Sequence, residues 1–183
     1  MNLISMAKQK DGFLGEQALV LPPAIVQRMK TDPATSILYI TDIGYYPKAY
    51  NHFRERETPI DQYVFIYCTE GRGWFSLDGQ KHPVVPNQYF ILPAGLPHAY
   101  GADEKEPMDN LLDSLRRNTC SALCTHRTCR LTDIKPGCIR VLVTGQNCFE
   151  EIFRVLKMGY SLENLSYASS VFHHYLGSLR YLR

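Results

Sequence analysis

The stretch Pro93-Ala94-Gly95-Leu96-Pro97-His98 decides the fold of this chain. It follows the apolar run Tyr89-Phe90-Ile91-Leu92, so a strand is stopped by one proline, turned by a glycine and restarted behind a second proline. In the restarted strand, His98 and Tyr100 stand two residues apart, and side chains at that spacing point to the same face. The stretch therefore predicts a strand, a turn and a second strand that presents a histidine and a tyrosine side by side.

The surrounding residues 37–100 predict further short strands separated by turns. Tyr63–Tyr67 is a strong strand candidate, and Asp78-Gly79 is typical of a two-residue hairpin turn. We expect Gly44 to break the strand that begins near Ser36. Several strands at a spacing of roughly ten residues favour an antiparallel sandwich or barrel.

The last part of the chain, residues 149–183, predicts two helices. Gly159 is a candidate to end the first helix, and Ser161 can cap the start of the second. The second helix has apolar residues in steps of three and four, namely Leu162, Leu165, Ala168, Phe172, Tyr175, Leu176, Leu179 and Leu182. This stripe is long enough to pack on its own domain or on a second copy of itself, and the sequence leaves both open.

Composition limits the classes of function. A chain of 183 residues is long enough for one domain with a sizeable core, and a net charge of +2 is too small to indicate nucleic-acid binding by charge alone. No apolar run approaches the ~20 residues of a membrane span, and residues 1–14 carry no apolar signal core. We therefore expect a cytoplasmic protein with no membrane partner, whose six cysteines are thiols rather than disulfides.

Three motifs between Tyr63 and Gly101 point to a family: the strand before Glu70-Gly71-Arg72-Gly73, the Asp78-Gly79 hairpin, and the run from Asn87 to Gly101. This part of the chain resembles the sensor domain of AraC-type transcription regulators, and its spacing Pro-x-Gly-x-x-His resembles the second motif of the cupin barrels. The resemblance implies a mainly β fold with C-terminal α, in which a cupin-like antiparallel β-barrel (a double-stranded β-helix) is followed by a helical pair.

The resemblance also implies a function. Such a domain senses a small polar effector, here expected to be a sugar, and forms a homodimer through its C-terminal helices. It controls DNA binding by a C-terminal helix-turn-helix domain, which we expect to be absent because the sequence stops at Arg183. The alternative is a stand-alone cupin enzyme that acts on a sugar or a small acid.

Five residues are candidates for binding the effector, namely Arg56, His98, Tyr100, Trp74 and His52. The resemblance matches Arg56 to an arginine on an early barrel strand and Tyr100 to the tyrosine after the Pro-Gly turn. A guanidinium fork suits sugar hydroxyls or a carboxylate. The alternatives stay open: Arg56 as a solvated loop residue, His98 bonded to backbone, and Trp74 as a core residue.

Metal chemistry and catalysis are not expected. Metal-dependent cupins carry a His-x-His and a glutamate on an earlier strand, where this chain has Tyr63–Tyr67. His98 alone is left of such a set, and one imidazole does not hold a catalytic metal. No nucleophile stands at a workable spacing from a base, so we expect neither a cofactor nor enzymatic activity.

The middle of the chain differs in composition from both flanks. No aromatic residue lies between Tyr100 and Phe149, and five of the six cysteines gather there. Cys120, Cys124, His126 and Cys129 offer four soft ligands, but their spacing is not that of a known zinc finger.

We hypothesise that residues from about Met108 to Arg130 are translated from a shifted reading frame. Read one base later, the codon for Met108 is forced to tryptophan, and the next nine codons can give Thr-Ile-Tyr-Trp-Ile-His-Phe-Ala-Gly. That sequence is an aromatic strand of the kind the resemblance places after the Pro-Gly-His turn. The alternative is a genuine insertion that forms a helix with the weak stripe Leu111, Leu112, Leu115 and Leu123.

The sequence thus predicts three parts. Residues 1–107 form a ligand-sensing barrel, residues 108–146 an anomalous cysteine-rich segment, and residues 147–183 a helical region for dimerisation.

Overall fold

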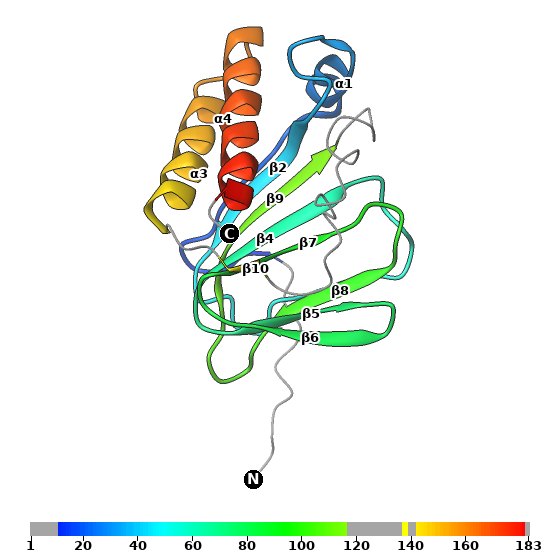
Figure 1. Ribbon diagram of the computed structural model, residues 1–183, viewed down its shortest axis with the longest axis vertical. Coiled ribbons are helices and arrows are strands. Elements are labelled where there is room, and N and C mark those ends of the chain that lie inside the picture. Colours follow the sequence, from blue (N-terminus) through cyan, green and yellow to red (C-terminus); the bar gives the residue numbers. More distant parts are fainter. Residues whose placement is uncertain (1–10, 117–136, 139–141, 182–183) are drawn as a thin grey trace.

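The computed structural model describes residues 11–116, 137–138 and 142–181. Two antiparallel sheets pack face to face into a flattened barrel, and two helices cover the outer face of the larger sheet (Figure 1). The fold is therefore mainly β, a cupin-like barrel followed by a pair of C-terminal helices, as predicted.

The larger sheet has the strand order β1-β2-β9-β4-β7-β10, with β1 (Gln17–Val20), β2 (Tyr39–Tyr46), β9 (Asp109–Arg116), β4 (Tyr63–Glu70), β7 (Gln88–Leu92) and β10 (Gly137–Cys138). The smaller sheet has the order β3-β8-β5-β6, with β3 (Phe53–Arg56), β8 (His98–Ala102), β5 (Gly73–Leu77) and β6 (Gln80–Val84). Side chains from both sheets meet inside the barrel, where the rings of Phe75 and Phe90 stack with centroids 4.5 Å apart.

The predicted turns form as their residues require. Asp78 and Gly79 both have positive φ, 51° and 75°, which a tight hairpin turn between β5 and β6 demands. Gly95, between β7 and β8, also lies in the left-handed region with φ 78°. His98 and Tyr100 share a face of β8 and are both buried, which confirms the prediction that the two side chains lie side by side.

The prediction that Gly44 breaks its strand is wrong. Strand β2 continues through Gly44, which pairs with Ala18 of β1 and Leu112 of β9. A side chain at position 44 would meet Tyr46, because a Cβ built there lies 2.6 Å from Cε2 of that ring. The glycine provides space inside the barrel, which is a packing role rather than a break.

The residues that directly follow residue 107 form a strand of the barrel, whereas the sequence analysis separated them from the barrel. Strand β9 lies in the middle of the larger sheet, paired with β2 on one side and β4 on the other, so the barrel continues to Arg116. A helical stripe is ruled out here, because Leu111 and Leu115 face the helices while Leu112 faces the barrel interior. Cys120, Cys124, His126 and Cys129 lie outside the described residues.

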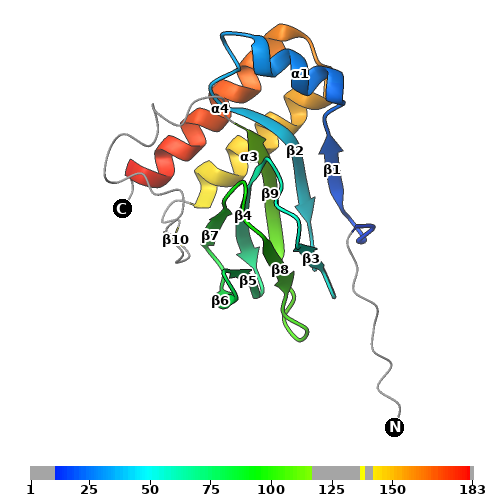
Figure 2. The ribbon, with the colours of Figure 1, turned by 90° about the vertical axis from the view of Figure 1, so that its right-hand side faces the viewer.

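Helix α1 (Pro23–Thr31) closes one end of the larger sheet, and helices α3 (Leu142–Lys157) and α4 (Leu162–Tyr181) lie side by side on its outer face (Figure 2). The Ser161 hydroxyl accepts a hydrogen bond from the Asn164 amide at 3.2 Å, which confirms the predicted cap. The apolar stripe of α4 is buried against its own chain through Leu165, Ala168, Phe172 and Tyr175. Among the described helices, none is long and apolar enough to cross a membrane.

Candidate ligand-binding site

Four polar side chains gather at one end of the barrel interior, and we call them the mouth layer: Asp42, Arg56, His98 and Ser114. Two pairs of strands position them. Arg56 of β3 lies opposite His98 of β8, and Asp42 of β2 lies opposite Ser114 of β9. Asp42 and Arg56 are partly exposed, so this end of the barrel is open to solvent.

Arg56 contacts both His98 and Tyr100 of strand β8. The Arg56 Nη1 lies 3.5 Å from His98 Nε2, and the guanidinium carbon lies 6.0 Å from the centre of the Tyr100 ring. His98 Nδ1 lies 2.9 Å from the Leu96 carbonyl oxygen, so Nδ1 carries the proton and Nε2 is free to accept from Arg56. Burial lowers the pKa of His98, and the Arg56 charge lowers it further, so the ring is neutral at pH 7.

Asp42 supplies the carboxylate of the mouth layer. Its Oδ2 accepts a hydrogen bond from the Thr41 hydroxyl at 3.1 Å, and the Ser114 side chain bonds to it as well. Burial raises the pKa of Asp42, while these hydrogen bonds and the charge of Arg56 oppose that rise. The layer therefore offers a cation and a carboxylate, a neutral imidazole and a hydroxyl.

The opposite end of the barrel interior is closed by three buried residues, which we call the closed layer: Tyr46, His52 and Asn110. The rings of Tyr46 and His52 are stacked with centroids 5.4 Å apart, and the ring of Tyr100 meets His52 edge-on at 5.6 Å. Burial lowers the pKa of His52 to about 4, so this ring is neutral. Asn110 is 0% exposed, and neither atom of its amide has a hydrogen-bond partner within the described part of the chain.

A segment near the N-terminus covers the closed layer. The Phe13 ring belongs to the barrel core and lies 5.1 Å from the His52 ring. Asp11 forms an ion pair with Arg54 of β3, whose neighbour across the sheet is Tyr100. Residues 11–13 are thus tied to strand β3, which also carries Arg56 of the mouth layer.

The structure brings together four of the five predicted site residues. Arg56, His98 and Tyr100 form one cluster, and His52 touches Tyr100 from the closed layer. Arg56 is part of a strand rather than a solvated loop. Trp74 is not part of the group, because it faces the outside of the smaller sheet, where its ring contacts Phe53 and Lys81.

Asp42 and Ser114 were missed by the sequence analysis. Their closeness depends on the pairing of β2 with β9, strands that lie some seventy residues apart, as in the register of Asp42 with Ser114. The local signal was a single carboxylate within an apolar strand, Tyr39–Tyr46, which on its own does not reveal a partner. Among the described residues, no group of three or more His, Cys, Asp or Glu side chains is arranged to hold a metal ion.

Comparison with known proteins gives a family match and one curated relative. Residues 43–110 match the AraC-like ligand binding domain. Over 169 residues the chain is 28% identical to the MmsAB operon regulatory protein of Pseudomonas aeruginosa, a match that covers 90% of this chain and 54% of that protein. The chain thus spans about half the length of the curated relative.

Solved structures with a similar fold include KdgF from Halomonas sp., at 16% identity and a TM-score of 0.38, covering 58% of this chain and 82% of that one. A second is the Cupin_2 domain of an XRE family transcriptional regulator from Enterobacter cloacae, at 15% identity and a TM-score of 0.39, covering 58% of this chain and 100% of that one.

Proposed function

Because residues 43–110 of this chain form an AraC-like ligand-binding domain, we propose that the protein senses a neutral sugar at the mouth layer of its barrel and so regulates transcription. The observation that carries the proposal is the cluster of Arg56, His98 and Tyr100, held together across β3 and β8. The protein binds its effector and does not transform it.

The mouth layer suits a sugar better than an acid. Arg56 brings a positive charge and Asp42 a negative one, so the layer has no net charge to attract an anion. A sugar hydroxyl both donates and accepts, and the layer offers a donor in Arg56 and an acceptor in the Asp42 carboxylate. The Tyr100 ring is buried beneath the guanidinium and helps to hold Arg56 in place for the sugar.

The signal would leave the site through strand β3. A sugar held by Arg56 changes the surroundings of Arg54, two residues away on the same face, and Arg54 holds Asp11. We expect the N-terminal segment and the helices to pack differently in the two states, and so to change how two copies pair. In this proposal, the protein is cytoplasmic, and DNA is contacted through a C-terminal helix-turn-helix domain rather than through this barrel.

A thermal-shift screen followed by calorimetry tests the proposal, with neutral pentoses and hexoses as probes and uronic acids as charged controls. A neutral sugar should raise the melting temperature by mass action. Arg56→Lys keeps the charge but loses the planar fork, so we expect its affinity for that sugar to fall at least about tenfold.

Trp74→Phe is the matched control, because Trp74 lies on the outer face of the smaller sheet and its replacement should leave the sugar affinity unchanged. If no neutral sugar shifts the melting temperature, or if Arg56→Lys binds as tightly as the unchanged protein, the proposal is wrong. Stoichiometric zinc or iron in the purified protein would instead favour a cupin enzyme.

A further inference from the structure

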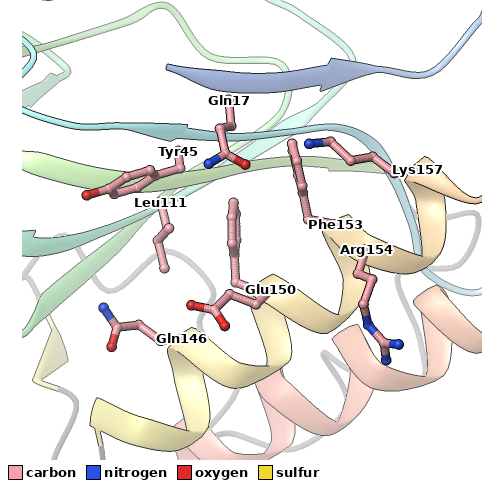
Figure 3. Close-up of a pocket in the computed structure, with 9 residues that line it drawn as sticks. Gln17, Tyr45, Leu111, Gln146, Glu150, Phe153, Arg154 and Lys157 are labelled. Atoms are coloured by element: carbon pink, nitrogen blue, oxygen red, sulfur yellow. The ribbon is translucent and has the colours of Figure 1, made fainter. Parts of the chain in front are cut away.

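We propose that a cavity between helix α3 and the outer face of the larger sheet is a second binding site, which takes a small acid with a flat apolar body. The cavity has a volume of about 460 Å³, in the range of small-molecule sites (Figure 3). It is separate from the mouth layer, because it is lined by Leu111 and Tyr45, whose side chains face the helices rather than the barrel interior.

The floor of this α3 cavity is apolar and largely aromatic. Leu111, Phe149 and Phe153 line it and are 5%, 5% and 7% exposed. The rings of Phe149 and Phe153 lie one turn apart on α3, nearly parallel at 14° and with centroids 6.1 Å apart. Two nearly parallel rings with a leucine opposite favour a planar apolar group over a branched or polar one.

The rim of the α3 cavity is polar and its charges are separated. The Lys157 ammonium lies 4.4 Å from the centre of the Phe153 ring, which places a cation at the edge of the aromatic floor. The carboxylate of the rim, Glu150, lies toward Gln146 at the other end of the cavity (Figure 3). An acid therefore finds its partner at Lys157 and avoids Glu150 when its apolar body lies along the floor.

A ligand in the α3 cavity would act on the helices directly. Its walls are β1, β2 and β9 on one side and α3 on the other, and α3 packs along α4. Occupancy would alter how α3 rests on the sheet, so the site gives the helical pair an input that is independent of the mouth layer.

The test uses 2-naphthoate and 2-naphthalenemethanol, which share a flat body and differ in charge, with the full chain labelled with ¹⁵N. We expect naphthoate to shift amide signals of Tyr45, Leu111 and Phe153, and the alcohol to bind roughly fivefold more weakly. Lys157→Gln should weaken naphthoate by the same factor, and Lys157→Arg should restore it.

Arg154→Gln is the matched control. Arg154 also lines the cavity, one turn from Lys157, but in Figure 3 its guanidinium points away from the sheet. Removing this charge should therefore change naphthoate affinity less than about twofold. Gln146→Trp, at the exposed rim, should fill the cavity and abolish binding. Melting temperatures of all variants, and sugar binding by Lys157→Gln, show that fold and mouth layer are intact.

Four results would overturn this inference: no binding of naphthoate, equal binding of acid and alcohol, equal loss in Lys157→Gln and Arg154→Gln, or signal shifts confined to the mouth layer. None of these results contradicts the proposed sugar site, because sugar binding is measured from the signals of different residues. If no sugar binds while naphthoate binds as expected, the proposal for the mouth layer is wrong and the proposal for the α3 cavity is supported.

Discussion

At the scale of single residues, one end of the barrel interior is filled by an aromatic cluster that depends on a glycine. Gly44 has no side chain, and the Tyr46 ring occupies the space above it, with its hydroxyl oxygen 2.9 Å from where a Cβ would be. Tyr46 then stacks on His52, and Phe13 meets both rings edge-on. A substitution at any of these positions should therefore alter the packing of the others.

Replacement of Gly44 by alanine tests this unit. The added methyl group would force the Tyr46 ring to move, so we expect Gly44→Ala to lower the free energy of unfolding by about 1–3 kcal/mol. The control is Gly177→Ala in helix α4, where a Cβ meets nothing within 4 Å and should raise that free energy by about 0.5–1 kcal/mol. Urea unfolding of both variants measures the effects, and a neutral Gly44→Ala would contradict the argument.

His52 should make stability depend on pH. Its pKa is lowered from 6.5 to about 4, first by burial and then by the charge of Arg54. As pH falls below 6.5, the unfolded chain takes up a proton at this ring while the folded chain does not, so the stability present above pH 6.5 is lost toward pH 4. Between pH 7.5 and pH 4.5 this loss amounts to about 2–3 kcal/mol.

The His52→Phe variant isolates the effect. Phenylalanine keeps the ring contacts with Phe13, Tyr46 and Tyr100 but does not titrate. We expect the variant to lose less unfolding free energy than the unchanged protein between the two pH values, by the amount given above. Asp42 and His98 titrate in both proteins, so their contributions cancel in the difference. Parallel pH profiles would show that His52 is not the group responsible.

At the scale of elements, the sequence predicts the strands whose apolar residues are bounded by clear turn residues. Strands β4, β5 and β7 were identified because apolar residues and turn residues stand where a buried strand and a hairpin need them. Strand β9 was not, because Asn110 and Ser114 occupy interior positions that the pattern expects to be apolar. The site was predictable only in part for a similar reason. His98 belongs to the Pro-x-Gly-x-x-His motif and Arg56 was matched through the family resemblance, whereas Asp42 and Ser114 meet only through long-range strand pairing.

Helix α4 should contribute strongly to stability through its buried stripe. Phe172 is fully buried against the larger sheet, so Phe172→Ala should cost about 3–5 kcal/mol of unfolding free energy. Tyr167 lies on the exposed side of the same helix and donates a hydrogen bond to Glu151, so Tyr167→Phe should cost less than about 1 kcal/mol. Guanidinium unfolding measures both. Similar costs for the two variants would mean that the stripe is not docked on the sheet.

At the scale of the whole molecule, the central strands of the larger sheet are buried on both faces. One core cluster fills the barrel and includes Val64, Ile66 and Leu112, and the other lies under the helices and includes Phe65 and Leu111. Neighbouring residues of one strand thus belong to different clusters, which ties the barrel and the helices into one cooperative unit. The three-part division predicted from the sequence places its first boundary inside this unit, because a boundary at residue 107 separates β9 from the strands on either side of it.

The reading-frame hypothesis concerns the integrity of the whole chain. The position of β9 in the middle of the larger sheet shows which of the shifted residues would be buried. In the shifted frame the residue at position 110 can be isoleucine, which would replace the buried Asn110 amide that has no partner among the described residues. At position 114 the shifted frame can give histidine, which would keep a polar group beside Asp42, where Ser114 now bonds. Positions 111 and 115 can become tyrosine and phenylalanine, and both positions face the aromatic-rich cluster under the helices.

Sequencing the gene around codons 108–130 tests this hypothesis directly, and we expect a base gained or lost relative to the genes of related regulators. Stability gives a second test. Asn110→Val removes an unpaired buried amide and should raise the free energy of unfolding by about 1 kcal/mol or more, because no hydrogen bond is lost with it. Ser114→Val, on the same face of β9, breaks a bond to Asp42 and should lower that free energy by about 1–3 kcal/mol. An uninterrupted frame shared with related genes, together with a destabilising Asn110→Val, would show that β9 belongs to this protein as it stands.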